Sequence, residues 1–170
     1  TKLVVEKMLK DIHEGSRKLS VANLRYFNPI GAHSTGLIGE NSLGNTTNLF
    51  PILLEVASKK TKKLKIYGDD WSTYDGTCIR DYIHIEDLAE SHVVCLNYLF
   101  KNKSQYINFN IGTGTGTTVM ELIKTFERVN KVILPFEIYP RRLGDVPKLV
   151  ADNSYTCLLY TSPSPRDSVG

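Results

Sequence analysis

Cysteine is scarce in this 170-residue sequence, and the three cysteines stand far apart at positions 78, 95 and 157. No Cys-x-x-Cys pair is present. These absences argue against a structural zinc site and against a disulfide framework, and no metal is expected. Because disulfides are not needed, a reducing cytoplasmic location is expected.

Long apolar runs and a strong charge of one sign are also missing. No apolar stretch approaches the length of a membrane span, and no signal peptide is visible, so no membrane partner is expected. The net charge of +3, from 21 Lys and Arg against 18 Asp and Glu, is too small to indicate a nucleic-acid partner. The 41% hydrophobic share is typical of a globular protein with a buried core.

Apolar residues recur at two periods along the chain, which indicates helices alternating with strands. The pattern predicts helices from Lys2 to near Gly15, over 48–59, over 86–100 and through 129 from a cap at Thr117 or Thr118, and strands over 21–27, 66–67, 80–83, 106–111 and 135–139. This alternation favours an α/β fold with a largely parallel sheet. Pro29 is expected to end the strand that begins at Val21, because proline cannot donate a ladder hydrogen bond. Residues 30–47 are predicted to form a long loop, of the kind that often binds a ligand.

The two ends of the chain indicate which residues belong to the folded protein. Thr1 is not methionine, and a helical pattern starts at Lys2 without a cap, so we expect a fragment that lacks an N-terminal part. From Cys157 onward the sequence has no period and resembles the translation of a sequencing adapter. We therefore expect residues 1–156 to be the folded protein and residues 157–170 to be a non-native tail. A native flexible tail is the alternative.

The central stretch from Tyr67 to Leu88 contains an arginine where a loop becomes a short strand. A guanidinium group held there, at Arg80, is suited to bind a phosphate or a carboxylate. The alternative is an ion pair between Arg80 and a neighbouring acid that holds the loop.

A second basic loop, Arg141 to Asp145, follows the strand predicted over 135–139. Arginines on two separate loops could converge on one diphosphate, since each guanidinium satisfies oxygens that a single cation cannot. With the aromatic Tyr67 nearby, a nucleotide-sugar pocket becomes a reasonable hypothesis. Two independent surface ion pairs are the alternative.

The run Gly112-Thr-Gly-Thr-Gly116 follows a predicted strand and precedes a predicted helix, as a dinucleotide-binding fingerprint does. Its spacing departs from that fingerprint, and no acidic residue follows at the expected distance. We interpret it as a tight strand-to-helix connection. On the next helix upstream, His92 and Cys95 are expected to be packed side chains rather than ligands or nucleophiles.

These segments carry a resemblance to one family. The chain resembles the C-terminal part of the UDP-glucose 4-epimerases, which are extended short-chain dehydrogenase/reductases. The matching segments, in the family's order, are residues 24–33, 36–40, 76–84, 110–116 and 141–145. The resemblance spans nearly all of residues 1–156. It implies the C-terminal part of an NAD-binding, Rossmann-like fold together with its small substrate-binding domain.

The resemblance also implies roles for individual residues. Lys2 would end a Tyr-x-x-x-Lys motif whose tyrosine lies before this chain, would lower the pKa of that catalytic tyrosine and would bind the nicotinamide ribose. Phe27 would lie beside the nicotinamide of NAD. The residues implied in binding the UDP-hexose substrate are Asn28, Asn48, Leu49, Tyr67, Arg80, Tyr82, Arg142, Asp145 and Leu149.

The implied reaction is the interconversion of UDP-glucose and UDP-galactose by NAD-dependent inversion at C4, through a 4-keto intermediate. The full-length parent would be a homodimer, and this fragment would be inactive because it lacks the tyrosine and the glycine-rich NAD loop. Leu149 stands where a bulky aromatic would restrict the sugar, so acceptance of N-acetylated sugars stays open. The alternatives are another epimerase, dehydratase or decarboxylase of nucleotide sugars, or a non-catalytic binding module.

Overall fold

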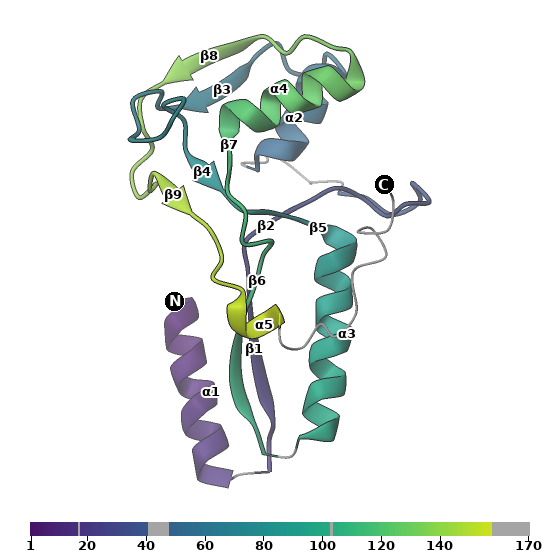
Figure 1. The fold of residues 1–170 in the computed structure, drawn as a ribbon, viewed down its shortest axis with the longest axis vertical. Helices are drawn as coiled ribbons and strands as arrows, with labels where there is room; N and C mark the ends of the chain where they lie inside the picture. The colour runs from purple at the N-terminus through teal and green to yellow at the C-terminus, as the bar shows by residue number, and fades with distance from the viewer. Residues whose placement is uncertain (17, 41–47, 103, 158–170) are drawn as a thin grey trace.

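The chain forms two lobes joined at a narrow waist (Figure 1). The computed structural model describes residues 1–16, 18–40, 48–102 and 104–157. The lower lobe of Figure 1 contains α1 (Lys2–Ser16), β1 (Val21–Tyr26), α3 (Ile85–Lys101), β6 (Tyr106–Ile111) and α5 (Ser154–Cys157). The upper lobe contains α2 (Leu49–Ala57), β3 (Leu64–Tyr67), α4 (Val119–Asn130) and β8 (Phe136–Tyr139). The short strands of the waist are β2 (Asn28–Ile30), β4 (Ile79–Arg80), β5 (Tyr82–His84), β7 (Thr117–Thr118) and β9 (Lys148–Leu149).

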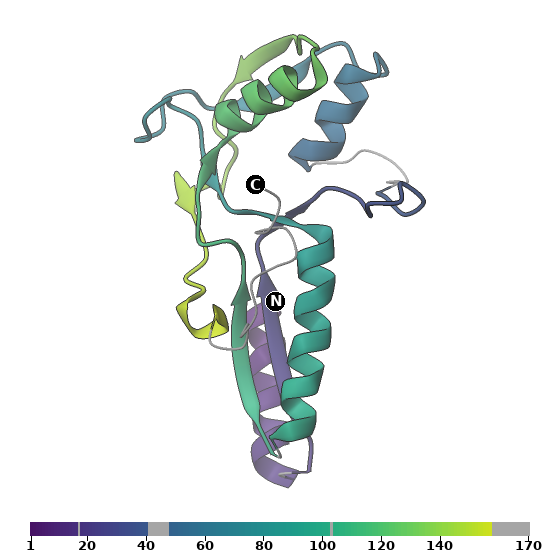
Figure 2. The same cartoon turned by 45° about the vertical axis from the view of Figure 1, so that its right-hand side comes forward.

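The lower lobe is built on a parallel strand pair with a helix on either side. β1 and β6 pair over their full lengths, from Val21 opposite Tyr106 to Tyr26 opposite Ile111. α1 and α3 both contact β1 and flank the pair in two views (Figures 1 and 2). The core between β6 and α3 consists of Ile83, Leu88, Cys95, Ile107, Phe109 and Ile111. Alternation of inward and outward residues along β6 produces this burial.

One face of α3 packs against the core of the lower lobe. Leu88, Ser91 and Cys95 are its buried residues, so the prediction that Cys95 is packed is confirmed. The prediction that His92 is packed in the core is wrong, because the residue is exposed, with its ring centroid 6.3 Å from that of Tyr26 and its Nδ1 2.8 Å from the Leu88 carbonyl oxygen of the same helix.

The upper lobe packs α2 and α4 against the parallel pair β3–β8. Its core residues come from α2, β3, α4 and the segment before β8: Leu53, Val56, Leu64, Ile66, Ile123, Phe126 and Leu134. α4 begins where predicted, because the Thr118 hydroxyl accepts from the Glu121 N–H and the Glu121 carboxylate accepts from the Thr118 N–H. This capping box fixes the first turn of the helix.

At the waist, β2 pairs in parallel with β5, and β4 lies between β7 and β9. The prediction that Pro29 ends a strand is wrong, since Pro29 lies inside β2 opposite Ile83. The Asn28 N–H donates to the Asp81 carbonyl, so bonding to β5 runs through the residues beside the proline. Alternate residues of a strand bond to alternate sides, so the missing N–H of Pro29 costs no bond to β5.

The fold is α/β, and its strand pairs are parallel except for β4–β7, as the alternating pattern predicted. The strand predicted over 80–83 is interrupted at Asp81, and β9 and α5 follow the strand that was expected to be the last. Residues 31–40 contain no helix or strand. The rest of the predicted loop up to Thr47, and the tail from residue 158, lie outside the described residues.

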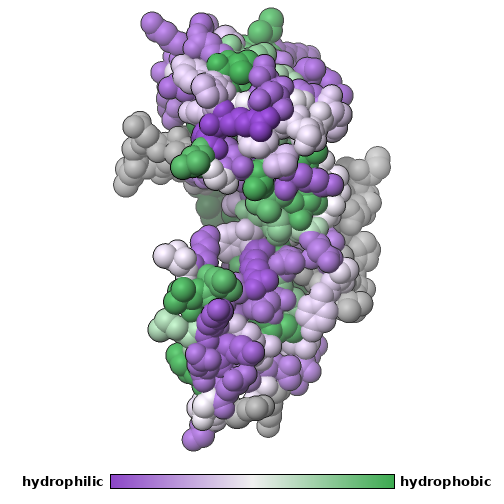
Figure 3. All heavy atoms as spheres, turned by 90° about the vertical axis from the view of Figure 1, so that its left-hand side faces the viewer, coloured by the Kyte–Doolittle hydropathy of each residue, from purple (hydrophilic) through white to green (hydrophobic). Residues whose placement is uncertain are grey.

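Apolar side chains also reach the surface. In Figure 3, which views the molecule from the side of α1, hydrophobic residues appear at the waist and again on the lower lobe. The exposed apolar residues of α1 are Leu3, Val4, Val5, Met8 and Ile12, each more than half exposed. None of the helices in the described ranges has the length and hydrophobicity needed to cross a bilayer.

A buried carboxylate holds the waist together. Asp81 is fully buried, and its Oδ1 accepts from the Thr113 N–H and hydroxyl at 2.9 and 2.7 Å. Its Oδ2 accepts from the N–H groups of Gly114 and Ala151 at 3.0 and 3.1 Å. A Cβ atom at Gly112 would stand 2.6 Å from the same oxygen, so the glycine is required there. The glycine run is thus the tight strand-to-helix connection that its spacing indicated.

We predict that replacing Asp81 destabilises the chain strongly. Asp81→Ala leaves buried N–H groups without an acceptor and should lower the free energy of unfolding by about 3 kcal/mol or more. Asp81→Asn should also be destabilising, because its amide N–H group would face backbone donors. Urea denaturation measures both effects. The exposed Asp11→Ala is the control, with an expected change within about 0.5 kcal/mol, and an Asp81→Ala curve equal to that control would contradict the prediction.

Candidate functional site

A cleft of about 340 Å³ lies at the waist beneath the upper lobe. Its walls come from β2, the start of α2, β3, the stretch from Thr77 to Tyr82, the first residue of α4, and the segment between β8 and β9. This volume lies within the range of small-molecule sites. The cleft therefore brings together segments that are far apart in the sequence.

Most of the predicted substrate-binding residues line this cleft. Those that line it are Asn28, Asn48, Leu49, Tyr67, Arg80, Tyr82, Arg142 and Asp145. Leu149 lies outside the lining, about half exposed in β9, where it pairs with Arg80. Lys2 and Phe27 also lie outside it. The structure thus brings eight of the predicted substrate-binding residues together in one cleft. The binding role of each residue stays a prediction.

The two arginine loops converge on one carboxylate. Arg80 Nη2 lies 3.6 Å from Asp145 Oδ1, and Arg142 Nε donates to Asp145 Oδ2 at 2.9 Å. Arg80 is the more buried of the two, with 14% of its side chain exposed against 48% for Arg142. Arg80 Nη1 also donates to the carbonyls of Ile79 and Val146 at 2.8 Å. The two pairs are therefore joined through Asp145 rather than independent.

The Tyr67 ring lines the cleft and lies beside the ring of Tyr139, which is outside the lining. Tyr67 and Tyr139 are register partners in β3 and β8, with ring centroids 5.9 Å apart. The Arg142 guanidinium carbon lies 4.8 Å from the centre of the Tyr67 ring, and Lys65 Nζ lies 5.1 Å from that of Tyr139. Cations over aromatic faces are attracted by the ring quadrupole. A positive group thus stands beside each ring of the pair.

Two weak acids in the cleft have raised pKa values. Burial raises the pKa of Tyr82 to about 12, although the nearby positive charge of Arg80 opposes the shift. Burial likewise raises the pKa of the Cys78 thiol, again against the charge of Arg80. Both groups are therefore neutral around pH 7. Neither is suited to act as a base or as a thiolate nucleophile there.

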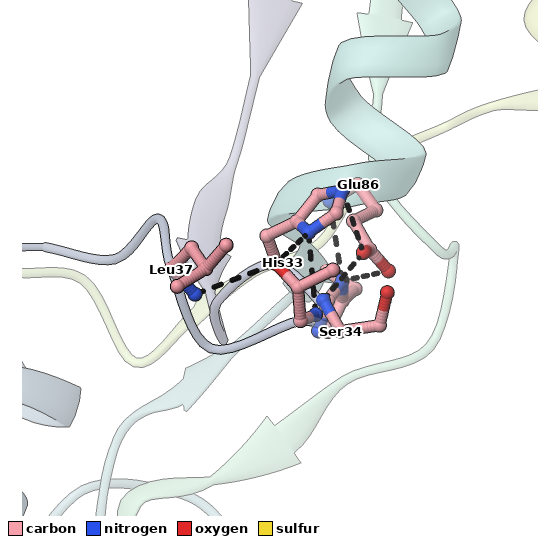
Figure 4. A network of polar contacts seen from close by, with 6 residues as sticks. His33, Ser34, Leu37 and Glu86 are labelled. Atoms are coloured by element: carbon pink, nitrogen blue, oxygen red, sulfur yellow. Dashed lines mark hydrogen bonds and ion pairs between the residues drawn. The ribbon is translucent and has the colours of Figure 1, made fainter.

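The loop after β2 is held against the start of α3, as Figure 4 shows. The Ser34 N–H donates to Glu86 Oε1 at 2.8 Å, and His33 Nε2 lies 3.8 Å from the same oxygen. His84 caps α3 by accepting from the Glu86 N–H. A Cβ atom at Gly31 would stand 2.4 Å from His84 Nε2, so the loop leaves β2 in contact with that ring. These contacts fix the direction of the loop where it leaves the cleft.

The predicted cofactor residues share one end of the lower lobe. Arg25 Nε and Nη2 donate to the two carboxylate oxygens of Glu6 at 2.8 and 2.5 Å, which places the end of β1 beside the start of α1. Lys2, one helical turn before Glu6, and Phe27, just after β1, therefore lie at the same end. That end is the carboxyl edge of the parallel pair, where ligands bind in α/β sheets.

Sequence reasoning did not assign some of the lining residues to the site. Lys65 lies two residues before Tyr67 on β3, and strand alternation places both on one face, so its position could have been found. Cys78 stands two residues before Arg80, and the same alternation indicates it. Val119 comes from the start of α4 and carries no local signal of a site.

Comparison with known proteins decides the family. The profile of the NAD dependent epimerase/dehydratase family matches residues 1–112 of the chain. The chain belongs to this family. A bifunctional GAL10 protein of Pachysolen tannophilus is 48% identical to this epimerase/dehydratase chain over 155 residues, which make up 89% of the chain and 22% of that relative.

Solved structures show the same likeness. A UDP-glucose-4-epimerase from Stenotrophomonas maltophila, crystallised with NAD and formylated UDP-arabinopyranose, matches with a TM-score of 0.88 and 44% identity over 92% of the chain. The Bifidobacterium longum UDP-glucose 4-epimerase with NAD+ and UDP matches with a TM-score of 0.85 and 42% identity over 90% of it. This family member spans 46% and 45% of those chains, respectively.

We predict that Tyr82 gives a phenol ionisation near pH 12 that is absent from Tyr82→Phe. An unfolded phenol has a pKa of about 10. The raised folded pKa contributes stability that is fully present below about pH 10 and is lost as the pH rises toward that of the folded group. Difference absorbance during alkaline titration measures this ionisation. Survival of the highest-pH component in Tyr82→Phe would contradict the assignment.

Proposed function

We propose that this chain supplies the UDP-sugar-binding half of an NAD-dependent 4-epimerase that interconverts UDP-glucose and UDP-galactose. The observation that carries the proposal is the convergence of Arg80, Arg142 and Asp145 beside Tyr67 in one cleft. Two solved structures of similar sequence are UDP-glucose 4-epimerases, one bound to a formylated UDP-arabinopyranose and the other to UDP. The parts of the cleft correspond to the parts of such a ligand.

Each polar group in the cleft suits one part of UDP. The Tyr67 ring offers a flat face on which the uracil would stack. The guanidinium groups of Arg80 and Arg142 would bind the diphosphate oxygens from two loops. The Asp145 carboxylate would accept hydrogen bonds from the ribose hydroxyls. Asn28, on the waist side of the cleft, would contact the sugar.

A cleft that binds the nucleotide part of the substrate more tightly than the sugar suits inversion at a sugar carbon. Anchoring the nucleotide through its diphosphate fixes one end of the substrate and leaves the hexose free to present either face of C4. The neutral Tyr82 and Cys78 would add no charge near the sugar. The cleft therefore binds and orients the substrate, and proton transfer at C4 falls to the tyrosine that the resemblance places before Lys2.

NAD would supply the hydride acceptor and donor for C4. The arrangement is compatible with its nicotinamide end, since the Arg25–Glu6 bonds bring the start of α1, which carries Lys2, to the carboxyl end of β1, which precedes Phe27. Lys2 would donate to the nicotinamide ribose, and Phe27 would pack beside the nicotinamide ring. The run from Gly112 to Gly116 does not fit the pyrophosphate of NAD, because N–H groups of Thr113 and Gly114 already donate to Asp81.

We also propose that the complete protein forms a homodimer. The support is the apolar surface of α1, whose residues from Leu3 to Ile12 include five that are more than half exposed. An apolar face of this kind gains stability when it is buried against another protein surface.

We predict that the chain binds UDP and that Arg142→Ala weakens binding about 10- to 100-fold, because a hydrogen bond to a charged group contributes roughly 1.5–3 kcal/mol. Uridine lacks the diphosphate, so its affinity should change less than that of UDP; Arg142 also lies over the Tyr67 ring, which is why some change is expected. Titration calorimetry with each ligand measures both. The exposed Arg128→Ala on α4 is the charge-matched control, and equal UDP affinity of the two variants would refute the proposed diphosphate site.

The aromatic face gives a separate prediction. Tyr67→Ala should weaken UDP binding about tenfold, since stacking of a base on an aromatic ring contributes roughly 1–3 kcal/mol. Tyr67→Phe keeps the ring and should bind UDP within about twofold of the wild type. The same calorimetric titration checks this, and equal losses in both variants would show that the hydroxyl matters instead of the ring.

We predict that the 170-residue chain alone does not convert UDP-galactose into UDP-glucose, although it binds UDP. A tyrosine four residues before Lys2 and a glycine-rich NAD loop are not among its residues. Chromatography of the two UDP-sugars after long incubation with NAD tests the expectation. Any protein-dependent product formation would disprove it, and the complete enzyme that carries this chain provides the positive control.

A further inference from the structure

The exposed turn between β8 and β9 carries two consecutive arginines in different environments. Arg142 lines the cleft, whereas Arg141 does not. Arg141 Nε donates to Asp70 Oδ1 at 2.8 Å, and its Nη2 donates to the Asp70 carbonyl at 2.5 Å. Its guanidinium carbon also lies 4.1 Å from the centre of the Trp71 ring. Arg141 thus joins this turn to the loop that follows β3.

Gly68 makes the packing around Arg141 possible. A Cβ atom at Gly68 would stand 2.9 Å from Arg141 Cγ and 2.5 Å from Trp71 Nε1. The absence of a side chain lets the arginine stem and the indole lie against the backbone there. Trp71 Nε1 in turn donates to the Tyr67 carbonyl at 3.2 Å. Contacts therefore run from Arg141 through Trp71 to Tyr67, whose ring lines the cleft.

The turn that carries Arg142 and Asp145 is held at both ends. Arg141 binds Asp70 immediately before it, and Arg80 donates to the Val146 carbonyl immediately after it. Between these anchors the turn projects outward, since Leu143 is fully exposed and Gly144 has a φ of +88°. A turn with an exposed tip depends on its anchors for its direction. Its first anchor, unlike its second, consists of residues outside the cleft.

We propose that Arg141 is a positioning residue, which binds Asp70 and Trp71 and thereby aims Arg142 and Asp145 into the cleft. The inference rests on the proposed UDP site. Arg141 and Asp70 would affect UDP binding without touching the ligand. Because they form one ion pair, removal of either Arg141 or Asp70 would weaken UDP binding.

Removal of Asp70 separates positioning from simple electrostatics. Taking away a negative charge near an anion site would by itself tighten UDP binding. Positioning predicts the opposite, because Arg141 loses its main partner and the turn loses its first anchor. Asp70→Ala and Arg141→Ala should each weaken UDP binding about fivefold, the upper end of what a solvent-exposed ion pair contributes. Titration calorimetry on the full chain measures these affinities, and thermal unfolding verifies that each variant is folded.

A double substitution tests whether Arg141 acts through Arg142. If it does, Arg141→Ala in an Arg142→Ala background should weaken UDP binding by less than about twofold further, since residues that act together are not additive. Arg141→Lys keeps the charge but loses the bidentate contact, so it should recover only part of the affinity. Fluorescence of Trp71, the one tryptophan in the sequence, reports the contact directly. Acrylamide should quench it more in Arg141→Ala and Asp70→Ala, and not in Arg142→Ala.

The affinities of these variants decide whether Arg141 positions Arg142. Tighter UDP binding by Asp70→Ala, full recovery by Arg141→Lys, or additive losses in the double variant would overturn it. An Arg142→Ala variant with wild-type UDP affinity would instead remove the proposed UDP site itself. Loss of affinity in Arg142→Ala without loss in Arg141→Ala would leave that site intact and refute the positioning role alone.

Discussion

The carboxylate of Asp81 connects the glycine-rich turn after β6 with the segment after β9 through hydrogen bonds to both of its oxygens. Its backbone carbonyl accepts from the Asn28 N–H at 3.0 Å, and its chain neighbours are Arg80 and Tyr82. All three of these residues line the cleft. A buried charge is tolerated only with a full set of hydrogen bonds, so the waist can adopt few other arrangements. The direction of Arg80 follows from that constraint.

The two walls of the cleft differ in how they are held. On one side, Tyr67 belongs to β3, which pairs with β8 and contributes to the core of the upper lobe. On the other side, Arg142 and Asp145 stand on a turn whose tip has no core beneath it. A flat ring on a paired strand and charged groups on an anchored turn therefore meet in the same cleft. This combination suits a ligand with a planar base at one end and flexible phosphates beyond it.

Local patterns predicted much of this fold. The strand at 106–111 alternates strictly, and Thr118 with Glu121 forms a capping box, so both elements were visible in a few residues. The two-residue strands β4, β7 and β9 are too short to show a period. Their pairing depends on tertiary contacts, such as Arg80 opposite Leu149. The prediction for Pro29 failed because the sequence does not show which residues of β2 bond to β5. That choice depends on how the two strands pair.

The site was predictable to a different degree. The residue types of the two arginine loops indicated an anion site, and the resemblance named eight of the residues that line the cleft, including all of its arginines. The anchor formed by Arg141, Asp70 and Trp71 carried no comparable signal in the sequence. Arg141 and Asp70, which form its hydrogen bond, are 71 residues apart along the chain. Leu149 followed from the resemblance alone, and the structure places it on the strand beside Arg80 and outside the lining.

The position of Asp145 between two guanidinium groups has a consequence for selectivity. The carboxylate behaves as a tethered counter-ion, which keeps the cations close together when no ligand is bound and limits their mutual repulsion. An incoming anion must share them with a competitor that cannot diffuse away. Chloride or another singly charged ion would gain little binding free energy in competition with Asp145. A diphosphate would contact both cations at once, so the proposed site would favour anions that carry more than one charge.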